Sequence, residues 1–247
     1  MDTQQLKKYK ILLIGDDCLD IYQYGTVDRI SPEAPVPVFV PGDETRCPGM
    51  AGNVYRNLEA LGCDVNYLHG KTSTKTRLLD SRSKQQLMRI DQDVISTPRC
   101  FDTEVPRVYD AIVISDYNKG TVDYHLIEEL IATGIPVFVD TKKTDLKRFE
   151  GAYIKINELE YNKLVSKCSG IIVTMGERGA RYNNVTVGAP LVEVSDVCGA
   201  GDTFLAALTY QYLDSKDIIS AIEFAVTAST ITVQHLGCYA PKLEEIK

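Results

Sequence analysis

A glycine-rich turn lies at Asp196-Val197-Cys198-Gly199-Ala200-Gly201-Asp202-Thr203-Phe204 and runs straight into the apolar segment 205–208. Two glycines around one alanine allow a sharp backbone turn and leave amide N–H groups free where a helix begins. Such amides, together with the positive end of the helix dipole, form an anion site. Asp202 follows at once, where a carboxylate can take a proton from a hydroxyl that attacks a phosphoryl group. The alternative is an ordinary loop in which Asp202 only caps the helix.

The composition is that of an intracellular globular protein. At 247 residues, with 44% hydrophobic and 25% charged residues, the chain is long enough for one large α/β domain, which we assign to residues 1–247. The net charge of −7, with no Lys/Arg run, argues against nucleic acid as a partner. Seven cysteines without a C-x-x-C pair indicate reduced thiols. No signal-peptide core and no apolar run of membrane length are present, so we expect a cytoplasmic protein without a membrane partner.

Strand and helix patterns alternate on both sides of the glycine-rich turn. Short apolar runs predict strands, and 3.6-residue periodicity predicts helices. The strands fall at 10–15, 65–68, 111–115, 136–140, 152–156 and 171–174, and the helices at 54–61, 122–133, 159–167 and 217–235. This alternation indicates an α/β fold with a doubly wound, mostly parallel sheet and flanking helices. Polar clusters follow several strand ends, which is the edge where such sheets bind ligands.

Residues 21–46 and 74–91 depart from this alternation. Prolines at 32, 35, 37 and 41 forbid a helix in the first segment and favour edge strands. The second segment has the pattern of a β-hairpin rich in Arg and Lys. We therefore predict a small β-sheet lid built from both segments. Its cations Arg77, Arg82 and Arg89 suit a substrate phosphate, or they only protect an exposed sheet edge.

Polar residues before the first predicted helix are further candidates for a binding site. Asp20 follows the first strand and can bind hydroxyl groups. Asn53 lies after small residues at the start of helix 54–61 and is either a cap or a contact to a ligand hydroxyl. The three histidines are scattered, which argues against a His-based metal site. No G-x-G motif follows the first strand, which argues against a dinucleotide site.

Three motifs resemble those of the ribokinase-like (phosphofructokinase-B) sugar kinases. The segment Asp196-x-x-Gly199-Ala200-Gly201-Asp202 resembles the family signature, Asn157-x-x-Glu160 its second motif, and Pro48-Gly49-Met50-Ala51-Gly52-Asn53 its N-terminal glycine motif. Within the family, the resemblance is closest to the D-glycero-β-D-manno-heptose 7-phosphate kinases. It extends over residues 9–241 and includes the segments 15–20, 29–38, 74–77, 85–89, 115–120 and 140–142.

The resemblance implies phosphorylation of the anomeric hydroxyl of a heptose 7-phosphate by ATP with Mg²⁺, as a step toward a nucleotide-activated heptose for surface polysaccharide. It implies that Asp202 is the base and that Gly199, Ala200 and Gly201 form the anion hole. The implied substrate contacts are Asp20, Gly49, Asn53, Arg77, Arg89, Asp116 and Lys119. The implied nucleotide contacts are Lys142, Asn157, Thr174, Gly176 and Gly179, with Glu160 organising the metal through water. Relatives often pair their lids, which implies a homodimer.

The chain also departs from the family pattern. Met50 stands where a second glycine is usual, Cys198 replaces a threonine, and Thr141 and Ile156 replace prolines. Compared with the family, the chain is short at 68–74 and at 161–171. The first shortening lies beside the expected sugar site and lid. Two alternatives therefore stay open: a kinase for another sugar or sugar phosphate, and a non-catalytic relative that binds a sugar phosphate or a nucleotide.

Overall fold

A computed structural model of the chain describes residues 8–98 and 108–246. Part of the irregular stretch expected at 92–107 therefore lies outside the described residues. The described strands form one ten-stranded sheet in the order β10-β9-β8-β7-β6-β5-β1-β3-β4, and β2 pairs with β1 beside this path. The six central strands β3, β1, β5, β6, β7 and β8 run parallel. The predicted α/β fold with a mostly parallel sheet is confirmed.

The element bounds are as follows. The strands are β1 (Lys10–Ile30), β2 (Pro37–Met50), β3 (Asp64–Asp80), β4 (Gln86–Gln92), β5 (Ala111–Asp116), β6 (Val137–Thr141), β7 (Tyr153–Asn157), β8 (Ile171–Thr174), β9 (Ala180–Tyr182) and β10 (Val185–Val187). The helices are α1 (Ala51–Ala60), α2 (Tyr124–Ala132), α3 (Glu158–Tyr161), α4 (Ala200–Ser215), α5 (Ile218–Thr232) and α6 (Leu243–Ile246), with 3-10 turns at Lys147–Phe149 and Gly176–Arg178.

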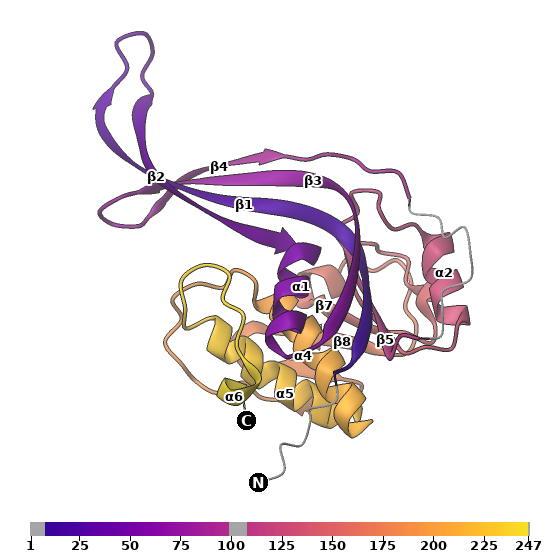
Figure 1. Cartoon of the computed structure of the whole chain (residues 1–247). Coiled ribbons are helices and arrows are strands. Elements are labelled where there is room, and N and C mark those ends of the chain that lie inside the picture. Colours follow the sequence, from indigo (N-terminus) through magenta and orange to yellow (C-terminus); the bar gives the residue numbers. More distant parts are fainter. Residues whose placement is uncertain (1–7, 99–107, 247) are drawn as a thin grey trace.

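Helices cover both faces of the parallel sheet (Figure 1). Successive strand residues point to opposite faces, so Ile11 and Leu13 pack under α1, α4 and α5, whereas Leu12 and Ile14 pack on the side of α2. This double burial explains why the strands are continuous apolar runs. It also brings the carboxyl ends of β5, β6 and β7 to one edge, beside the first turn of α4.

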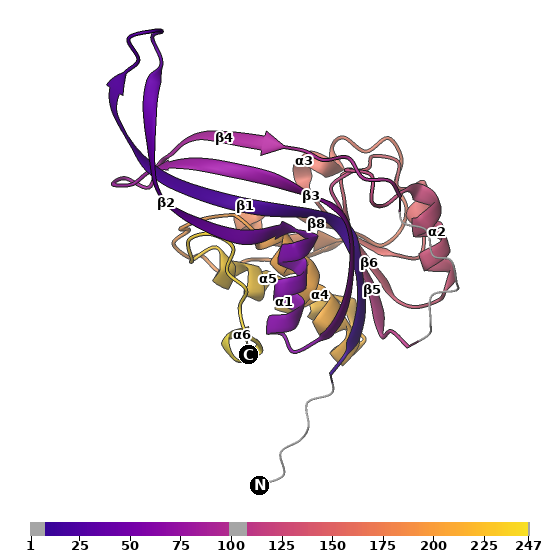
Figure 2. The ribbon, with the colours of Figure 1, turned by 45° about the horizontal axis from the view of Figure 1, so that its top comes forward.

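Strands β1 and β3 do not end at the edge of the parallel sheet. They continue outward and pair with β2 and β4 as an arm, defined here as residues 17–50 and 72–92 (Figures 1 and 2). The prediction that the first strand ends at Gly15 is therefore wrong. β2 pairs with β1 from Asp17 to Ile30, so the backbone of β1 remains hydrogen-bonded in the arm, with register shifts at Gln23–Gly25 and Val27–Ile30. The pairing of β1 with β3 has a further shift at Gly15–Asp17. β3 runs through 68–74, where the chain is shorter than the sugar kinases that it resembles.

The predicted helix at 159–167 is also wrong, because α3 ends at Tyr161. The following backbone pairs with a neighbouring segment instead: Val165 N–H donates to Thr144 O, and Leu146 N–H donates to Ser166 O. The predicted helices at 122–133 and 217–235 are confirmed as α2 and α5, each capped by an aspartate, Asp123 and Asp217.

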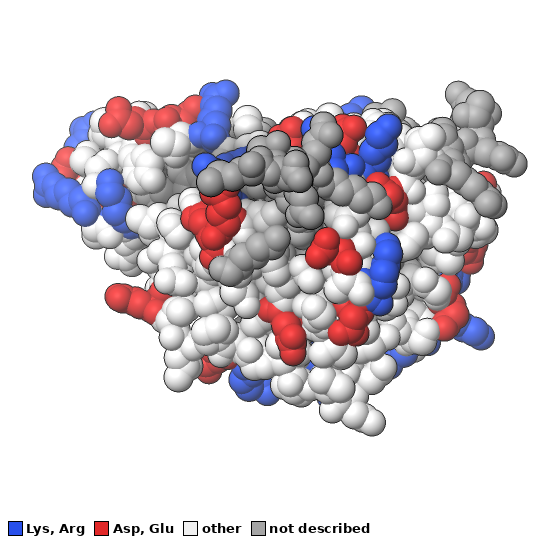
Figure 3. Space-filling model, turned by 60° about the horizontal axis from the view of Figure 1, so that its bottom comes forward, with Lys and Arg blue, Asp and Glu red and all other residues white. Residues whose placement is uncertain are grey.

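The surface mixes both signs of charge. On the face shown in Figure 3, Lys and Arg side chains are scattered among Asp and Glu side chains. An anionic substrate must therefore meet locally placed cations. None of the helices in residues 8–98 and 108–246 is long and apolar enough to cross a membrane.

Candidate active site

The glycine-rich turn forms the N-terminal end of α4. Gly199 caps the helix with a φ of 78°, a left-handed conformation that favours glycine. The Asp196 carboxylate holds the turn by accepting hydrogen bonds from Cys198 N–H and Gly237 N–H. The first intrahelical bond runs from Thr203 N–H to Gly199 O, so the amides of Gly201 and Asp202 precede it and remain available at the helix end. This geometry suits an anion.

Asp202 lies in the first turn of α4 and is buried, with 6% of its surface exposed. Its carboxylate accepts hydrogen bonds from Asn53 Nδ2 at 2.9 Å and from the Tyr117 hydroxyl at 3.2 Å. Burial raises its pKa to about 6, although the Asn53 bond and the Lys155 charge favour the ionised form. At neutral pH the group is a carboxylate that can accept a proton, as a general base must.

A buried ion pair joins the sheet to the glycine-rich turn. Lys155 on β7 donates to Asp140 on β6 at 2.6 Å, and both side chains are buried. A Cβ atom at Gly201 would lie 2.6 Å from Lys155 Nζ, so the absence of a side chain there admits the ammonium. The site thus has a fixed positive charge beside the free amides. The sequence analysis did not select Lys155 as a site residue. The feature that could have indicated it is a single lysine inside the apolar run 152–156.

The Asn157-x-x-Glu160 motif forms a capping box at the start of α3. Asn157 Oδ1 accepts from Glu160 N–H, and Glu160 Oε2 accepts from Asn157 N–H, each at 2.9 Å. The other Glu160 oxygen pairs with Lys142. Burial opposes the charge on Lys142, but Asp140 and Glu160 outweigh it, so the pKa of Lys142 is raised. The motif therefore places one carboxylate and one ammonium at the strand ends.

The donors at these strand ends fit a hydrated Mg²⁺. Among the described residues, no group of three His, Cys, Asp or Glu side chains could hold a metal by itself. Mg²⁺ in kinases is held by one or two carboxylates, waters and substrate phosphates. Asp140 Oδ1 is buried and accepts no hydrogen bond from the described residues, and Lys142 Nζ lies 3.8 Å from it. This oxygen and Glu160 are the available acid ligands.

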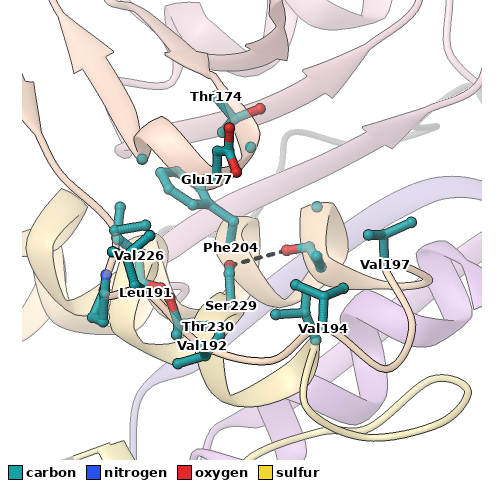
Figure 4. Close-up of a pocket in the computed structure, with 17 residues that line it drawn as sticks. Thr174, Glu177, Leu191, Val192, Val194, Val197, Phe204, Val226, Ser229 and Thr230 are labelled. Carbon is teal, nitrogen blue, oxygen red and sulfur yellow. Dashed lines mark hydrogen bonds between the residues drawn. The ribbon is translucent and has the colours of Figure 1, made fainter.

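An apolar pocket opens beside the start of α4 (Figure 4). It has a volume of about 280 Å³. Its walls include three of the predicted nucleotide contacts, Thr174, Gly176 and Gly179, together with Ala200 and Gly201 of the turn. The remaining lining is largely apolar, with Leu191, Val192, Val194, Val197, Phe204, Val226 and Val233. A pocket that joins an apolar wall to an anion site suits a molecule with a flat base and phosphates.

The arm contributes a second polar cluster. Asp20 on β1 pairs with Arg77 on β3, and both are largely buried. The Arg77 guanidinium also lies over the Tyr22 ring and donates to Cys198 Sγ at 3.5 Å. A Cβ atom at Gly49 would collide with the Asp20 carboxylate, so this glycine permits the close approach of β2. The structure thus brings Asp20, Gly49 and Arg77 together near the glycine-rich turn.

Register places further cations on the same face of the arm. Tyr22, Arg77 and Arg89 are direct neighbours across β1, β3 and β4, so their side chains share a face. Arg89 is exposed and bonds to Asp91. Lys75, two residues before Arg77, lies 5.5 Å from the centre of the Tyr117 ring, which itself bonds to Asp202. The sequence analysis did not select Lys75 or Tyr117, because the two residues are far apart in the chain and come close together only in the folded structure.

Asn53 and Met50 lie at the start of α1, and their positions there show what each residue does. Asn53 makes no cap: Met50 occupies the N-cap position and has no side-chain cap bond. The Asn53 amide instead orients Asp202, and Asn57 Nδ2 donates to the Asn53 carbonyl at 2.8 Å. Met50 is buried with a φ of 50°, an unusual conformation for a residue with a side chain. That conformation is what a glycine at this position would adopt without strain.

Asp116 and Lys119 are engaged in other bonds. The Asp116 carboxylate is buried among Thr141, Lys143 and the Asn118 N–H, and burial raises its pKa. Lys119 pairs with Asp93. The loop that carries them is anchored on Asp16, which accepts N–H bonds from residues 117, 119 and 121. Their predicted contact with substrate therefore stays a prediction.

Comparison with known proteins supports the sugar kinase resemblance. Residues 144–246 match the model described as pfkB family carbohydrate kinase. The bifunctional protein HldE of a Nitratiruptor species is 32% identical over 97% of this chain and 64% of its own length. The chain thus spans less than two thirds of that relative. The alignment runs over 301 positions, more than this chain has residues, so the relative carries insertions.

Solved structures share the fold. The ribokinase of Arabidopsis thaliana, complexed with ribose and ATP, has a TM-score of 0.71 at 14% identity, covering 97% of this chain and 98% of its own. The ribokinase of Thermotoga maritima has a TM-score of 0.73 at 16% identity, covering 96% and 98%. At this identity the likeness shows the fold alone, which is ribokinase-like.

Proposed function

We propose that this chain, which carries a carbohydrate kinase domain of the pfkB family, transfers the γ-phosphoryl group of ATP to the anomeric hydroxyl of a heptose 7-phosphate. The observation that carries the proposal is the buried Asp202 carboxylate beside the free amides of the glycine-rich turn and the Lys155 ammonium. A base, an oxyanion site and a fixed cation within one small space are the parts that phosphoryl transfer needs.

In the proposed reaction, Asp202 takes the proton of the attacking sugar hydroxyl. Asn53 and Tyr117 hold its carboxylate in place. The amides of Gly201 and Asp202 and the Lys155 ammonium stabilise the negative charge that spreads over the transferring phosphoryl oxygens. The apolar pocket binds the adenine and ribose, and Lys142 and Asn157 face the nucleotide phosphates. Asp140 and Glu160 would hold Mg²⁺, which would supply positive charge to neutralise the phosphates.

The arm offers groups for both parts of a phosphorylated sugar. Arg77 bonds to one oxygen of the Asp20 carboxylate. The other oxygen of Asp20 and the backbone near Gly49 can form hydrogen bonds with sugar hydroxyls. Lys75 and Arg89 lie on the same arm face and offer charge to a distal phosphate. The assignment to heptose 7-phosphate rests on the sequence segments of the arm, such as 29–38 and 85–89. We infer that the pathway supplies a nucleotide-activated heptose in the cytoplasm.

We also infer that the arm is a lid that pairs with the arm of a second copy. β4 is an edge strand with exposed Leu87, Met88 and Ile90, and apolar edge strands favour pairing with another chain. Light scattering should show a homodimer. A monomer at all concentrations would contradict the pairing and leave the kinase proposal intact.

The direct test is phosphate NMR of the protein with ATP, Mg²⁺ and heptose 7-phosphate. We expect a new anomeric phosphate resonance that grows as ADP forms. The same measurement with ribose, fructose 6-phosphate and other sugar phosphates serves as the substrate panel. ADP formation with none of these acceptors would contradict the kinase proposal.

A different sugar phosphate is the second candidate, because this chain lacks segments that its relative carries. Product with another sugar and none with the heptose would establish it. Calorimetry covers the non-catalytic alternative: binding of ATP or sugar phosphate, without any ADP formed, would show a binding protein instead of a kinase.

A further inference from the structure

Three thiols from distant segments meet beside the sugar-binding cluster. Cys47 lies on β2 of the arm, Cys198 precedes Gly199 in the glycine-rich turn, and Cys238 lies in the loop after α5. The Cys238 thiol is hydrogen-bonded to the thiols of both Cys47 and Cys198. Cys238 Sγ also lies 3.6 Å from the position of a Cβ atom on Gly199. These three thiols, the thiol cluster, therefore connect the arm to the turn that carries Asp202.

The three thiols lie in different electrostatic surroundings. Tyr22 and Arg77 donate to Cys198 Sγ, at 3.6 Å and 3.5 Å. The contact with the Cys238 thiol, together with the nearby charge of Arg56, lowers the pKa of the Cys47 thiol. The contact with Cys198 lowers the pKa of Cys238, but the contact with Cys47 and burial raise it to about 12. Cys47 is thus the thiol that most readily becomes a thiolate.

We propose that Cys47 and Cys238 form a reversible disulfide on exposure to a peroxide, and that this bond ties the arm to the glycine-rich turn and switches the site off. The six described cysteines are free thiols, and the members of the cluster are half-buried, so a small oxidant can reach them. A disulfide requires two thiols whose side chains face each other, and the Cys47 and Cys238 thiols are in contact. The switching effect rests on the proposed kinase function, whereas the disulfide itself does not.

The chemistry takes two steps. The Cys47 thiolate attacks one oxygen of hydrogen peroxide, which forms a sulfenic acid and releases hydroxide. The Cys238 sulfur then attacks the sulfenic sulfur, so that an S–S bond forms and the departing hydroxide leaves as water with the Cys238 proton. Two thiols lose two electrons, and one peroxide is reduced to two waters. A thiol reductant reverses the bond.

The consequence for the site follows from the neighbours of the cluster. Asp20 is the register partner of Cys47 and the ion-pair partner of Arg77. Movement of Cys238 toward Cys47 breaks its contact with Cys198, the residue that leads into Gly199. Displacements of this kind shift binding groups from their productive positions, and we expect at least about a tenfold loss of kcat/KM for the sugar. The loss should be restored by reductant.

The test oxidises the full chain with hydrogen peroxide and maps disulfide-linked peptides by mass spectrometry. We expect a Cys47–Cys238 link, a loss of two hydrogens from the intact mass, and recovery on reduction. Before oxidation, iodoacetamide should modify Cys47 at least about tenfold faster than Cys168, a half-buried thiol outside the cluster. Cys47→Ser and Cys238→Ser should each abolish the link, while Cys168→Ser should not.

Several outcomes would overturn the proposal. These are a Cys198–Cys238 link in place of the expected pair, links only between chains, or oxidation of Cys47 to acids without any link. Because the mapping is done on the wild-type protein, poor folding of a variant does not affect it. If the link forms but ADP production is unchanged, the disulfide stands and its switching role is wrong. If the reduced protein phosphorylates no sugar, only the kinase proposal fails.

Discussion

The two ends of strand β1 lie in opposite environments. In the parallel sheet, where helices cover both faces, Ile11 is 0% exposed, whereas in the arm Ile30 is 62% exposed. The parallel sheet and the first turn of α4 hold the ionisable groups of the site in buried positions. Lys155 is bonded to Asp140, and Asp202 accepts hydrogen bonds from Asn53 and Tyr117. The arm presents its cations on an open face. We infer that the sheet performs the chemistry and the arm selects the substrate.

This contrast predicts which kinetic constant each substitution changes. Groups that act in the transition state change kcat, and groups that bind substrate equally in both states change KM. Substitutions at the sheet edge should therefore lower kcat, and those on the arm should raise KM for the sugar alone. The predictions below run from the largest effect to the smallest.

Asp202→Asn should lower kcat by about three orders of magnitude or more, because the base is lost. The same change should stabilise the fold. The folded-state pKa is raised to about 6 from 3.8, so the protonated group stabilises the fold below about pH 4, and this stability is lost as pH rises through about 6. At about pH 8 the neutral Asn should recover on the order of 1–3 kcal/mol.

The measurement for Asp202→Asn pairs steady-state kinetics with denaturant unfolding. Asp214→Asn, on the exposed part of the same helix, is the matched control and should change neither quantity much. If turnover in Asp202→Asn stays within tenfold of wild type, Asp202 is not the base.

Lys155→Met should lower kcat about a hundredfold, because a fixed charge at the transferring phosphoryl group is lost. It should also destabilise the fold by about 3–5 kcal/mol, since Asp140 is left buried without its partner. Adding Asp140→Asn should recover stability but not turnover. Turnover that returns with stability would show that Lys155 serves the fold alone. Lys163→Met, on the exposed segment after α3, is the control.

Arg77→Gln should raise KM for the sugar about tenfold or more and leave KM for ATP within about twofold. The reason is that Arg77 fixes the Asp20 carboxylate on the arm face. Arg29→Gln, an exposed cation at the end of β1, should have no such effect. Equal changes in both KM values would contradict the division between arm and sheet.

Ile90→Thr on the arm should change the free energy of unfolding of the monomer by less than about 0.5 kcal/mol, because Ile90 is 45% exposed and lies on an edge strand. Ile114→Val in the sheet, where the side chain is fully buried, should cost about 0.5–1.5 kcal/mol. Urea unfolding at low protein concentration measures both. A larger cost for the arm residue would mean that the arm is packed more tightly than its exposure indicates.

The fold was predictable where the burial of a strand leaves a clear pattern of apolar residues in the sequence. Continuous apolar runs such as 111–115 predicted the parallel strands, and clustered prolines predicted the β character of the arm. The length of β1 was not predictable, because Gly15-Asp16-Asp17 has the pattern of a strand end. In the structure the Asp16 carboxylate is satisfied by three backbone N–H groups of the 117–121 loop, which lets a charged residue lie inside a strand.

The site was predictable only in part, because some of its residues depend on contacts between distant segments of the chain. The glycine-rich turn and the Asn157-x-x-Glu160 motif are local in sequence, so their residues could be selected. Lys155, Tyr117 and Lys75 acquire their places from strand register and from contacts between segments far apart in the chain. The spacing of these residues in the sequence does not indicate that they lie close together in the structure.

The pH dependence of kcat/KM for the sugar tests the central claim most directly, because it reports the ionisation of the base in the free enzyme. We expect activity to be low near pH 5, to rise with an apparent pKa of about 6 as Asp202 loses its proton, and to level off near about pH 8. The residual activity of Asp202→Asn should lack this rise. A profile that is flat over this range, or a rise that persists in Asp202→Asn, would show that Asp202 is not the group whose ionisation controls phosphoryl transfer.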